Sequence, residues 1–177
     1  ATINILGGRA AGITGVDGAL LQGRIREKEM GYVGEVVKVD LGLLEALLSS
    51  GYVPVVAPLA LHSFDRPSAA PPLLNINGDT IAGEIAAAIS AERLILLTDV
   101  AGIRDQSGRL LHRLSAGEAE ALMASGVASG GMVVKIKACL KALTSTSTAR
   151  IIDGTQPHAL RSEIEGYCDG TTIEAQR

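Results

Sequence analysis

Short aliphatic segments that alternate with helical patterns are the feature that most limits what this chain can fold into. Residues 53–57 and 93–97 are of strand length and consist mainly of Val, Ile and Leu. Each follows a helical pattern by a few residues, at 41–48 and 80–89 respectively. Strands that alternate with helices indicate βα units on a mainly parallel sheet. The sequence therefore predicts an α/β protein.

Composition agrees with this fold class. Hydrophobic residues make up 47% of the 177 residues, aromatic residues only 2%, and there are 21 glycines. Aliphatic strands with glycine-rich turns are typical of parallel α/β proteins. The length is sufficient for one domain with a substantial core. Because no repeat or linker divides the chain, we predict a single domain over residues 1–177.

Several classes of partner are disfavoured. A net charge of −3 gives no electrostatic footprint for nucleic acid, and few aromatic residues are present to stack on bases. We find no signal peptide pattern and no apolar run of transmembrane length, which predicts a cytoplasmic protein without membrane contact. Cys139 and Cys168 lack the spacing of a metal site, so no metal site is predicted, and Cys139 is expected in the core.

Local patterns predict further elements. Residues 1–6 are strand-like, and a domain that begins within a strand indicates that more sequence precedes it. Residues 12–18 form a glycine-rich turn, and the segments 20–28 and 33–39 can pair as a hairpin across Met30-Gly31, with the charged residues 27–29 on a solvated face. The remaining predictions are strands at 110–114, 150–152 and 171–173, a turn at 105–108, helices at 131–143 and 157–163, and a helix to about residue 125 that starts with a capping box at Ser115 and Glu118.

The stretch Ser-Gly-Gly-Met-Val-Val-Lys at residues 129–135 opens a predicted helix. Its two glycines allow backbone N–H groups to approach an anion closely. The helix dipole places partial positive charge at the same point, and Lys135 adds a full charge one turn further. The pattern is not that of a Walker loop. It predicts a phosphate site; the alternative is a flexible helix start followed by a solvated lysine.

Two other stretches are expected at the carboxyl edge of the sheet, where ligands of such folds bind. Asn75, Asn77 and Asp79 precede the helix at 80–89, where amides can hold a polar substrate and a carboxylate can orient lysines; the alternative is ordinary helix capping. Thr98–Ile103 follows the strand at 93–97 and can hold a nucleotide by backbone contacts; the alternative is an ordinary βα loop.

In this order, the three stretches resemble the motifs of the amino acid kinase family. The matching residues are Asn75-x-Asn77-x-Asp79, Leu96-Leu97-Thr98-Asp99-Val100-x-Gly102 and Gly130-Gly131-Met132-Val133-Val134-Lys135, with further matches at 12–18, 34–36, 51–56 and 153–154. The resemblance covers essentially the whole chain. It implies a three-layer α/β/α sandwich with a mainly parallel sheet, as in carbamate kinases.

The resemblance also implies a chemistry: phosphoryl transfer from ATP to a carboxylate. It is strongest to the members that phosphorylate the side chain of N-acetyl-L-glutamate in arginine synthesis, which are homo-oligomers such as dimers. By resemblance, Lys135 stabilises the transferring phosphoryl group, Asp79 holds the catalytic lysines, Asn75 binds the acetylated amino acid with Asn77 beside it, and Mg²⁺ arrives bridged by the phosphates. The residues implied for the ATP site are Thr98, Asp99, Val100, Ala101, Gly102, Ile103, Val127, Ala128, Ser129, Gly130, Gly131 and Met132.

The chain departs from the family pattern at its start. Four family features find no match in it: the Lys-x-Gly-Gly phosphate loop, a second catalytic lysine, a Gly-Gly substrate loop and a substrate arginine. The sequence therefore resembles the C-terminal two-thirds of a kinase, and we expect little or no activity from it alone. Two alternatives stay open: a kinase for carrier-linked aminoadipate or glutamate, and a non-catalytic module that binds a nucleotide or an amino acid.

Overall fold

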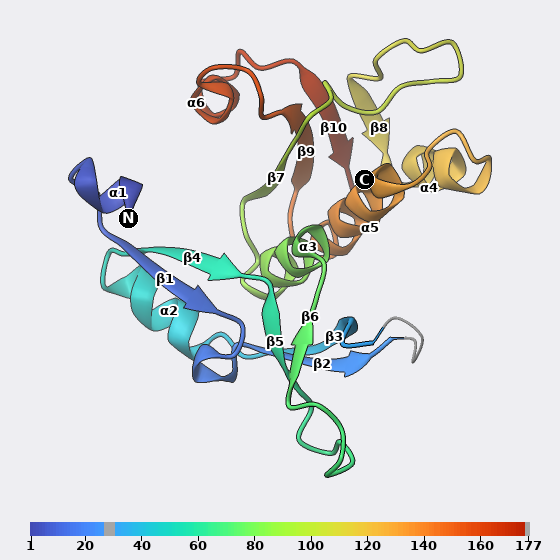
Figure 1. Ribbon diagram of the computed structural model, residues 1–177. Helices are drawn as coiled ribbons and strands as arrows, with labels where there is room; N and C mark the ends of the chain where they lie inside the picture. The colour runs from blue at the N-terminus through green and yellow to red at the C-terminus, as the bar shows by residue number, and fades with distance from the viewer. Residues whose placement is uncertain (27–30, 176–177) are drawn as a thin grey trace. The chain divides into compact units, whose positions relative to one another are not determined.

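The computed structural model describes residues 1–26 and 31–175, and it divides into two compact units, Ala1–Ile81 and Ala82–Arg177 (Figure 1). Met30 of the predicted hairpin turn and the charged residues 27–29 lie outside the described part of the chain. The single domain over residues 1–177 stays a prediction.

The first unit contains two sheets. β1 pairs with β4 in a two-stranded parallel sheet, and a second sheet has the order β3-β2-β5-β6. The predicted hairpin is confirmed, because β2 and β3 pair antiparallel from Leu21 opposite Val39 to Ile25 opposite Gly34. The elements are α1 (Thr2–Ile5), β1 (Ala10–Thr14), the 3₁₀ helix η1 (Asp17–Ala19), β2 (Leu21–Ile25), β3 (Gly34–Val39), α2 (Gly42–Ser49), β4 (Val53–Ala57), β5 (Leu59–His62) and β6 (Leu73–Asn75), followed by the start of α3 (Gly78–Ala88).

Three predictions for this unit are wrong in part. Residues 2–5 are helical rather than extended, because the Ile5 and Leu6 amides donate to carbonyls four residues earlier (3.0 and 3.1 Å) instead of to a neighbouring strand. The Asn4 side chain holds this turn to the start of β1: it accepts from the Ala10 amide (2.6 Å) and donates to the Ala10 carbonyl (3.0 Å). Residues 12–14 belong to β1 rather than to a turn, since β1 pairs with β4 along its whole length. β4 is a strand as predicted, but it is not buried, because Val53 and Val55 are exposed.

The second unit is built on one sheet of order β7-β9-β10-β8. β7 pairs parallel with β9 and β8 pairs parallel with β10, whereas β9 and β10 are antiparallel. β8 starts at Arg113 rather than at the predicted residue 110, because Leu110 pairs instead with Arg104 across the preceding turn. The elements are β7 (Arg93–Thr98), β8 (Arg113–Ser115), α4 (Ala116–Ala124), α5 (Gly131–Ala142), β9 (Thr148–Asp153), α6 (Ala159–Ile164) and β10 (Gly170–Glu174).

A hydrophobic core lies within the second unit, where α5 contacts β7 and β9 and α4 contacts β8 and β10. The predicted capping box starts α4: the Ser115 hydroxyl accepts from the Glu118 amide (3.2 Å) and the Glu118 carboxylate accepts from the Ser115 amide (2.8 Å). Cys139 is fully buried, as predicted. The buried members of the core are Ala86, Leu94, Leu96, Ile103, Leu114, Ala119, Ala128, Ile136, Ala138, Cys139, Ala142, Ala149, Ile151 and Ile173.

The α/β class is confirmed. Parallel pairs join β1 with β4, β2 with β5, β7 with β9 and β8 with β10, and helices flank the strands. Antiparallel pairs join β2 with β3, β5 with β6 and β9 with β10. No helix within residues 1–26 and 31–175 is both long enough and apolar enough to cross a membrane.

Candidate functional site

Two predicted acceptor-site residues flank one core residue in the first unit. Asn75 ends β6, and its backbone amide donates to the Tyr32 carbonyl (2.9 Å). Ile76 is buried, whereas Asn75 and Asn77 are exposed. Because alternate residues of an extended segment point to opposite faces, burial of Ile76 turns both asparagines to the open face. The chain therefore presents two side-chain amides side by side at this point.

Asn77 has a structural role as well. Its side-chain oxygen accepts from the amides of Asp79 (2.9 Å) and Thr80 (3.2 Å), which is how an N-cap residue satisfies the first amides of a helix. Asp79 lies half-buried in the first turn of α3, where a carboxylate is favoured by the helix dipole. The capping alternative therefore holds for Asn77, whereas the Asn75 side chain has no part in the cap.

The predicted nucleotide loop lies in the second unit and begins where β7 ends. The Thr98 carbonyl accepts from the amide of Gly154, which follows β9 (2.8 Å). A Cβ on Gly154 would lie 2.7 Å from the Leu97 Cβ, so the two strand ends approach too closely for any larger residue. Beyond Thr98, Asp99 and Val100 are exposed. This first half of the loop is thus open to solvent and fixed at its base.

The second half of the loop is packed into the unit. Gly102 has φ +142°, and a Cβ there would lie 2.6 Å from the Thr171 hydroxyl oxygen. Ile103 is 1% exposed, and its amide donates to that same hydroxyl (2.8 Å). The Ile103 side chain therefore belongs to the core, and any contact of Gly102 or Ile103 with a ligand has to be made by the backbone.

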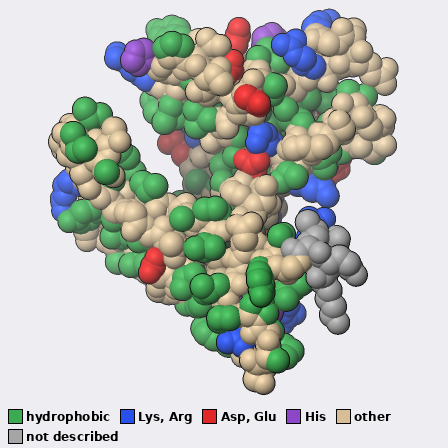
Figure 2. Space-filling view, viewed as in Figure 1, with side chains coloured by type: hydrophobic (Ala, Val, Ile, Leu, Met, Phe, Trp, Pro, Cys, Tyr) green, Lys and Arg blue, Asp and Glu red, His purple; other side chains and the backbone are tan. Residues whose placement is uncertain are grey.

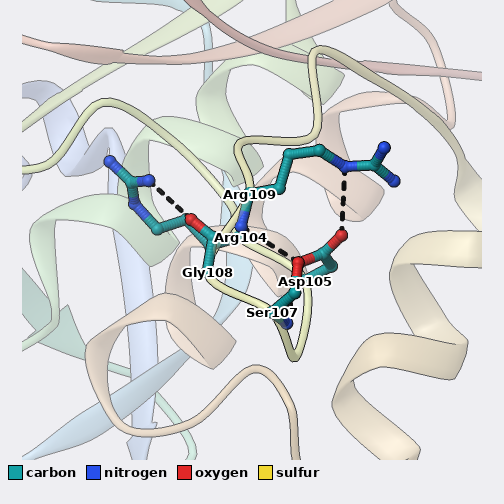
Figure 3. Close-up of polar contacts among 5 residues, drawn as sticks. All are labelled: Arg104, Asp105, Ser107, Gly108 and Arg109. Carbon is teal, nitrogen blue, oxygen red and sulfur yellow. Dashed lines mark hydrogen bonds and ion pairs between the residues drawn. The ribbon is translucent and has the colours of Figure 1, made fainter.

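A tight turn follows the loop (Figure 3). The Asp105 carboxylate accepts from the Ser107 hydroxyl (2.6 Å) and amide (2.9 Å) and from the Arg109 amide (3.0 Å). These bonds, led by the one from the Ser107 hydroxyl, lower the pKa of Asp105 below its ordinary value. The Arg104 guanidinium donates to the Gly108 carbonyl (2.7 Å) and closes the turn from the other side. The turn predicted at 105–108 is confirmed.

A pocket of about 640 Å³ lies in the second unit between this turn and α4. Apolar side chains cover part of its wall and polar side chains the rest. Its apolar residues are Leu111, Leu114, Ala121, Leu122 and Val127, and its polar residues are Asp105, Gln106, Ser107, Glu118 and Ser125. A pocket of this size with apolar walls and a few polar groups suits a small-molecule ligand. Val127 is the one residue of the predicted ATP set that lines it.

The glycine-led helix is confirmed as α5. Gly130 is its N-cap with φ +54°, a conformation that favours glycine. Gly131 has an ordinary backbone conformation, and a Cβ on either glycine would meet nothing within 4 Å. Packing inside the chain therefore does not explain Gly131. Space beside the backbone at a helix N-terminus is what a phosphate group requires.

The other residues of this stretch divide between core and surface. Ala128 is buried, and its amide donates to the Leu122 carbonyl (3.0 Å). Ser129 is exposed, and Met132 packs partly buried against the core. Lys135 is half-buried one turn into α5, next to the fully buried Ile136. The structure thus brings the loop 98–103 and the stretch 127–132 together in one unit around a common core through Ile103 and Ala128.

Sequence reasoning missed two supports of this region. Thr171 holds the end of the loop 98–103, and Arg150 forms a largely buried ion pair with Glu163, donating from Nε and from one terminal nitrogen to its two carboxylate oxygens (2.8 Å each). Arg150 also donates to the Thr172 hydroxyl (2.6 Å). Thr171 and Arg150 stand in short strand segments without any motif of their own. No local pattern in 148–153 or 170–174 marks either residue.

The described residues contain no group of three or more His, Cys, Asp or Glu side chains placed to hold a metal ion. His62 ends β5 and is buried, with its Nδ1 2.9 Å from the Pro71 carbonyl oxygen. His112 and His158 are exposed.

Comparison with known proteins identifies the family. The profile of the amino acid kinase family matches residues 1–153. An acetylglutamate kinase from Dehalococcoides mccartyi is 51% identical over 172 residues, which is 97% of this chain and 63% of that protein. The chain thus spans less than two-thirds of the length of this curated relative.

Solved structures show the same fold. The protein smu.665 from Streptococcus mutans superposes with a TM-score of 0.79 at 23% identity, over 99% of this chain and 64% of that one. A carbamate kinase from Giardia lamblia bound to AMP-PNP superposes with a TM-score of 0.66 at 19% identity, over 81% of this chain and 47% of that one. The chain belongs to the amino acid kinase family, and the resemblance seen in its motifs is confirmed.

Proposed function

We propose that this member of the amino acid kinase family carries the ATP-binding part of an acetylglutamate kinase. The reaction is transfer of the γ-phosphoryl group of ATP to the side-chain carboxylate of N-acetyl-L-glutamate, which gives N-acetylglutamyl 5-phosphate and ADP in arginine synthesis. The observation that carries the proposal is the 51% identity over 97% of the chain to a protein of that name. As part of the same proposal, the protein is a cytoplasmic homodimer whose 177 residues form the C-terminal two-thirds of one kinase domain.

Phosphoryl transfer needs positioning and positive charge more than covalent chemistry. A carboxylate oxygen of the acceptor forms a bond to the γ-phosphorus while the bond from that phosphorus to the bridging oxygen of ADP breaks. Lys135 would stabilise the charge on the phosphoryl oxygens, and Gly130 and Gly131 would let the phosphates approach the start of α5. Open space at both glycines supports this role. Mg²⁺ would arrive with ATP, held by its phosphates.

The base of the nucleotide would enter the 640 Å³ pocket. Val127 belongs to the predicted ATP stretch and lines the pocket, and Asp105 lies two residues beyond the predicted loop. Apolar walls can contact the faces of a purine, and the polar side chains can bond to its edge. The exposed residues Asp99 and Val100 would reach the ligand by their backbone.

The acceptor would be bound by the first unit. Asn75 is exposed and takes no part in capping α3, so its amide can bond to the polar groups of an acetylated amino acid. Asn77 would contribute with the amide nitrogen that its capping bonds leave available, and Asp79 would hold catalytic lysines.

The test uses two proteins: this chain, and a chimera in which the part of the Dehalococcoides relative that the chain does not match is joined in front of it. Release of ADP is measured with N-acetylglutamate and with a carrier-linked aminoadipate. We expect little turnover from the chain alone, and turnover with N-acetylglutamate from the chimera. Preference for the carrier-linked substrate would instead show that the protein is a kinase for carrier-linked aminoadipate or glutamate.

Lys135→Ala in the chimera is expected to lower turnover by about 10²–10³, the usual cost of losing one transition-state donor. Lys137→Ala is the matched control, because Lys137 is exposed on the same helix. Equal turnover of both variants would refute the role of Lys135. Calorimetry with ATP and Mg²⁺ separates the non-catalytic alternative: a chimera that binds nucleotide without turnover supports it, and one that binds no nucleotide removes the kinase reading.

A further inference from the structure

One hydroxyl in the second unit joins two segments that are far apart in sequence. Thr171 is fully buried in β10. Its Oγ1 accepts from the Ile103 amide (2.8 Å) and donates to the Leu111 carbonyl (2.7 Å). A threonine hydroxyl has one hydrogen to donate, and Thr171 donates it to the Leu111 carbonyl. The two bonds tie the end of the loop 98–103 and the wall of the pocket to the same strand.

The geometry around this hydroxyl leaves little freedom. A Cβ on Gly102 would lie 2.6 Å from the Thr171 oxygen and 3.0 Å from Leu110 Cδ1, so the loop backbone passes directly against the hydroxyl. The Leu111 amide also donates to the Ile103 carbonyl (2.8 Å). Ile103, Leu111 and Thr171 thus form a closed set of three hydrogen bonds.

The loop between its two anchors has an open stretch. Gly154 fixes it at the Thr98 carbonyl, and Thr171 fixes it at the Ile103 amide. Between them, Asp99 and Val100 are exposed. The conformation of this open stretch is therefore set mainly by where its two ends are held.

We propose that Thr171 is a positioning residue for nucleotide binding, which sets the end of the loop 98–103 relative to the pocket wall at Leu111. This inference rests on the proposed function, since it takes that loop and that pocket to bind ATP. Thr171 itself is buried and touches no ligand. Its effect reaches the nucleotide through the backbone of Gly102 and Ile103.

The test compares Thr171→Val, which keeps the shape but removes the hydroxyl, with Thr171→Ser, which keeps the hydroxyl. Thr172→Val is the matched control: the neighbouring threonine on the same strand also loses a hydrogen bond, but that bond goes to Arg150. Should Thr171→Val fail to fold, Thr171→Cys replaces it, because a thiol has similar size and is a weak hydrogen-bonding group.

Two quantities are measured on each variant and on the unsubstituted chain, which is the parent protein. They are hydrogen exchange at the Ile103 amide and, by calorimetry, the Kd for ATP with Mg²⁺. We expect Thr171→Val to speed exchange at Ile103 and to weaken ATP binding by at least about tenfold, because removal of the hydroxyl loses two buried hydrogen bonds. Thr171→Ser and Thr172→Val are expected to stay near the parent protein in both measurements.

Equal ATP affinity in Thr171→Val and the parent, or equal weakening by Thr172→Val, would overturn the positioning role. A parent protein that does not bind ATP would instead overturn the proposed function and, with it, the role of Thr171 toward nucleotide. Exchange at Ile103 would then still show whether the hydroxyl holds the loop, so the two failures are distinguishable.

Discussion

The two units bury their apolar residues to different degrees. The second unit has a continuous core in which Ile136, Ile151 and Ile173 are fully buried. The first unit leaves Val53 and Val55 about half exposed on its two-stranded parallel sheet, and hydrophobic side chains are spread over the face of this unit seen in Figure 2. Parallel sheets are normally covered on both faces, and isolated two-stranded sheets are marginal. The predicted nucleotide residues thus have a well-packed support, whereas the predicted acceptor residues belong to the less covered unit.

The largest difference is expected between two ion pairs. Glu163→Ala in the second unit leaves Arg150, whose side chain is only 16% exposed, without its partner carboxylate, which costs about 3–5 kcal/mol. Asp65→Ala in the first unit removes an exposed pair with Arg24, which contributes little to stability because both side chains stay solvated. Urea unfolding, followed by hydrogen exchange in peptides from each unit, measures the stability of each unit separately. Similar losses for the two variants would contradict the contrast between the units.

Core truncation tests the same contrast without charge. Ile151→Ala, in the strand between β7 and β10, should cost roughly 2–5 kcal/mol, because it leaves a cavity in the core. Val55→Ala removes a half-exposed side chain and should change stability by about 0.5 kcal/mol or less. The free energies of unfolding of the two variants, measured by urea titration, test this difference. A large loss from Val55→Ala would mean that β4 is covered in solution.

Asn77 allows capping to be separated from substrate binding. Asn77→Ala should destabilise α3 by about 1 kcal/mol, while Asn77→Ser keeps an oxygen that can cap the helix. If Asn77 also binds the acceptor, Asn77→Ser in the chimera should have the stability of the unsubstituted chimera but should keep the raised KM for N-acetylglutamate of Asn77→Ala. Recovery of both by serine would leave capping as its role.

The smallest effect concerns acid. Hydrogen bonds, first that from the Thr155 hydroxyl for Asp153 and that from the Thr14 amide for Asp17, lower the pKa of each carboxyl below its ordinary value of 3.8. A lowered folded pKa gives stability that is present above about pH 4 and is lost as pH falls through the folded value. Asp153→Asn should reduce the loss of stability of the second unit at low pH without changing that of the first unit. Asp17→Asn should do the same for the first unit only. Melting temperatures from pH 7 to pH 2 measure this, and an unchanged limb would show that these turns contribute nothing.

Much of the fold could be predicted from local patterns. The hairpin of β2 and β3, the capping box of α4, the glycine start of α5 and the turn at Asp105 are all confirmed, because each depends on residues close together in sequence. The helix at residues 2–5 was missed because a short apolar run does not tell whether its amides bond within the segment or to a neighbouring strand. The exposure of β4 was missed because an apolar run does not tell whether anything covers it.

Residue types at short spacings were enough to indicate the family, the α/β class and the motifs proposed to bind ATP and the acceptor. Only the tertiary structure shows that Ile103 belongs to the core and that Thr171, 68 residues further along the chain, holds the end of the loop 98–103. Such contacts join segments distant along the chain. They arise only when strands β7, β9 and β10 pair in one sheet, which no short pattern encodes.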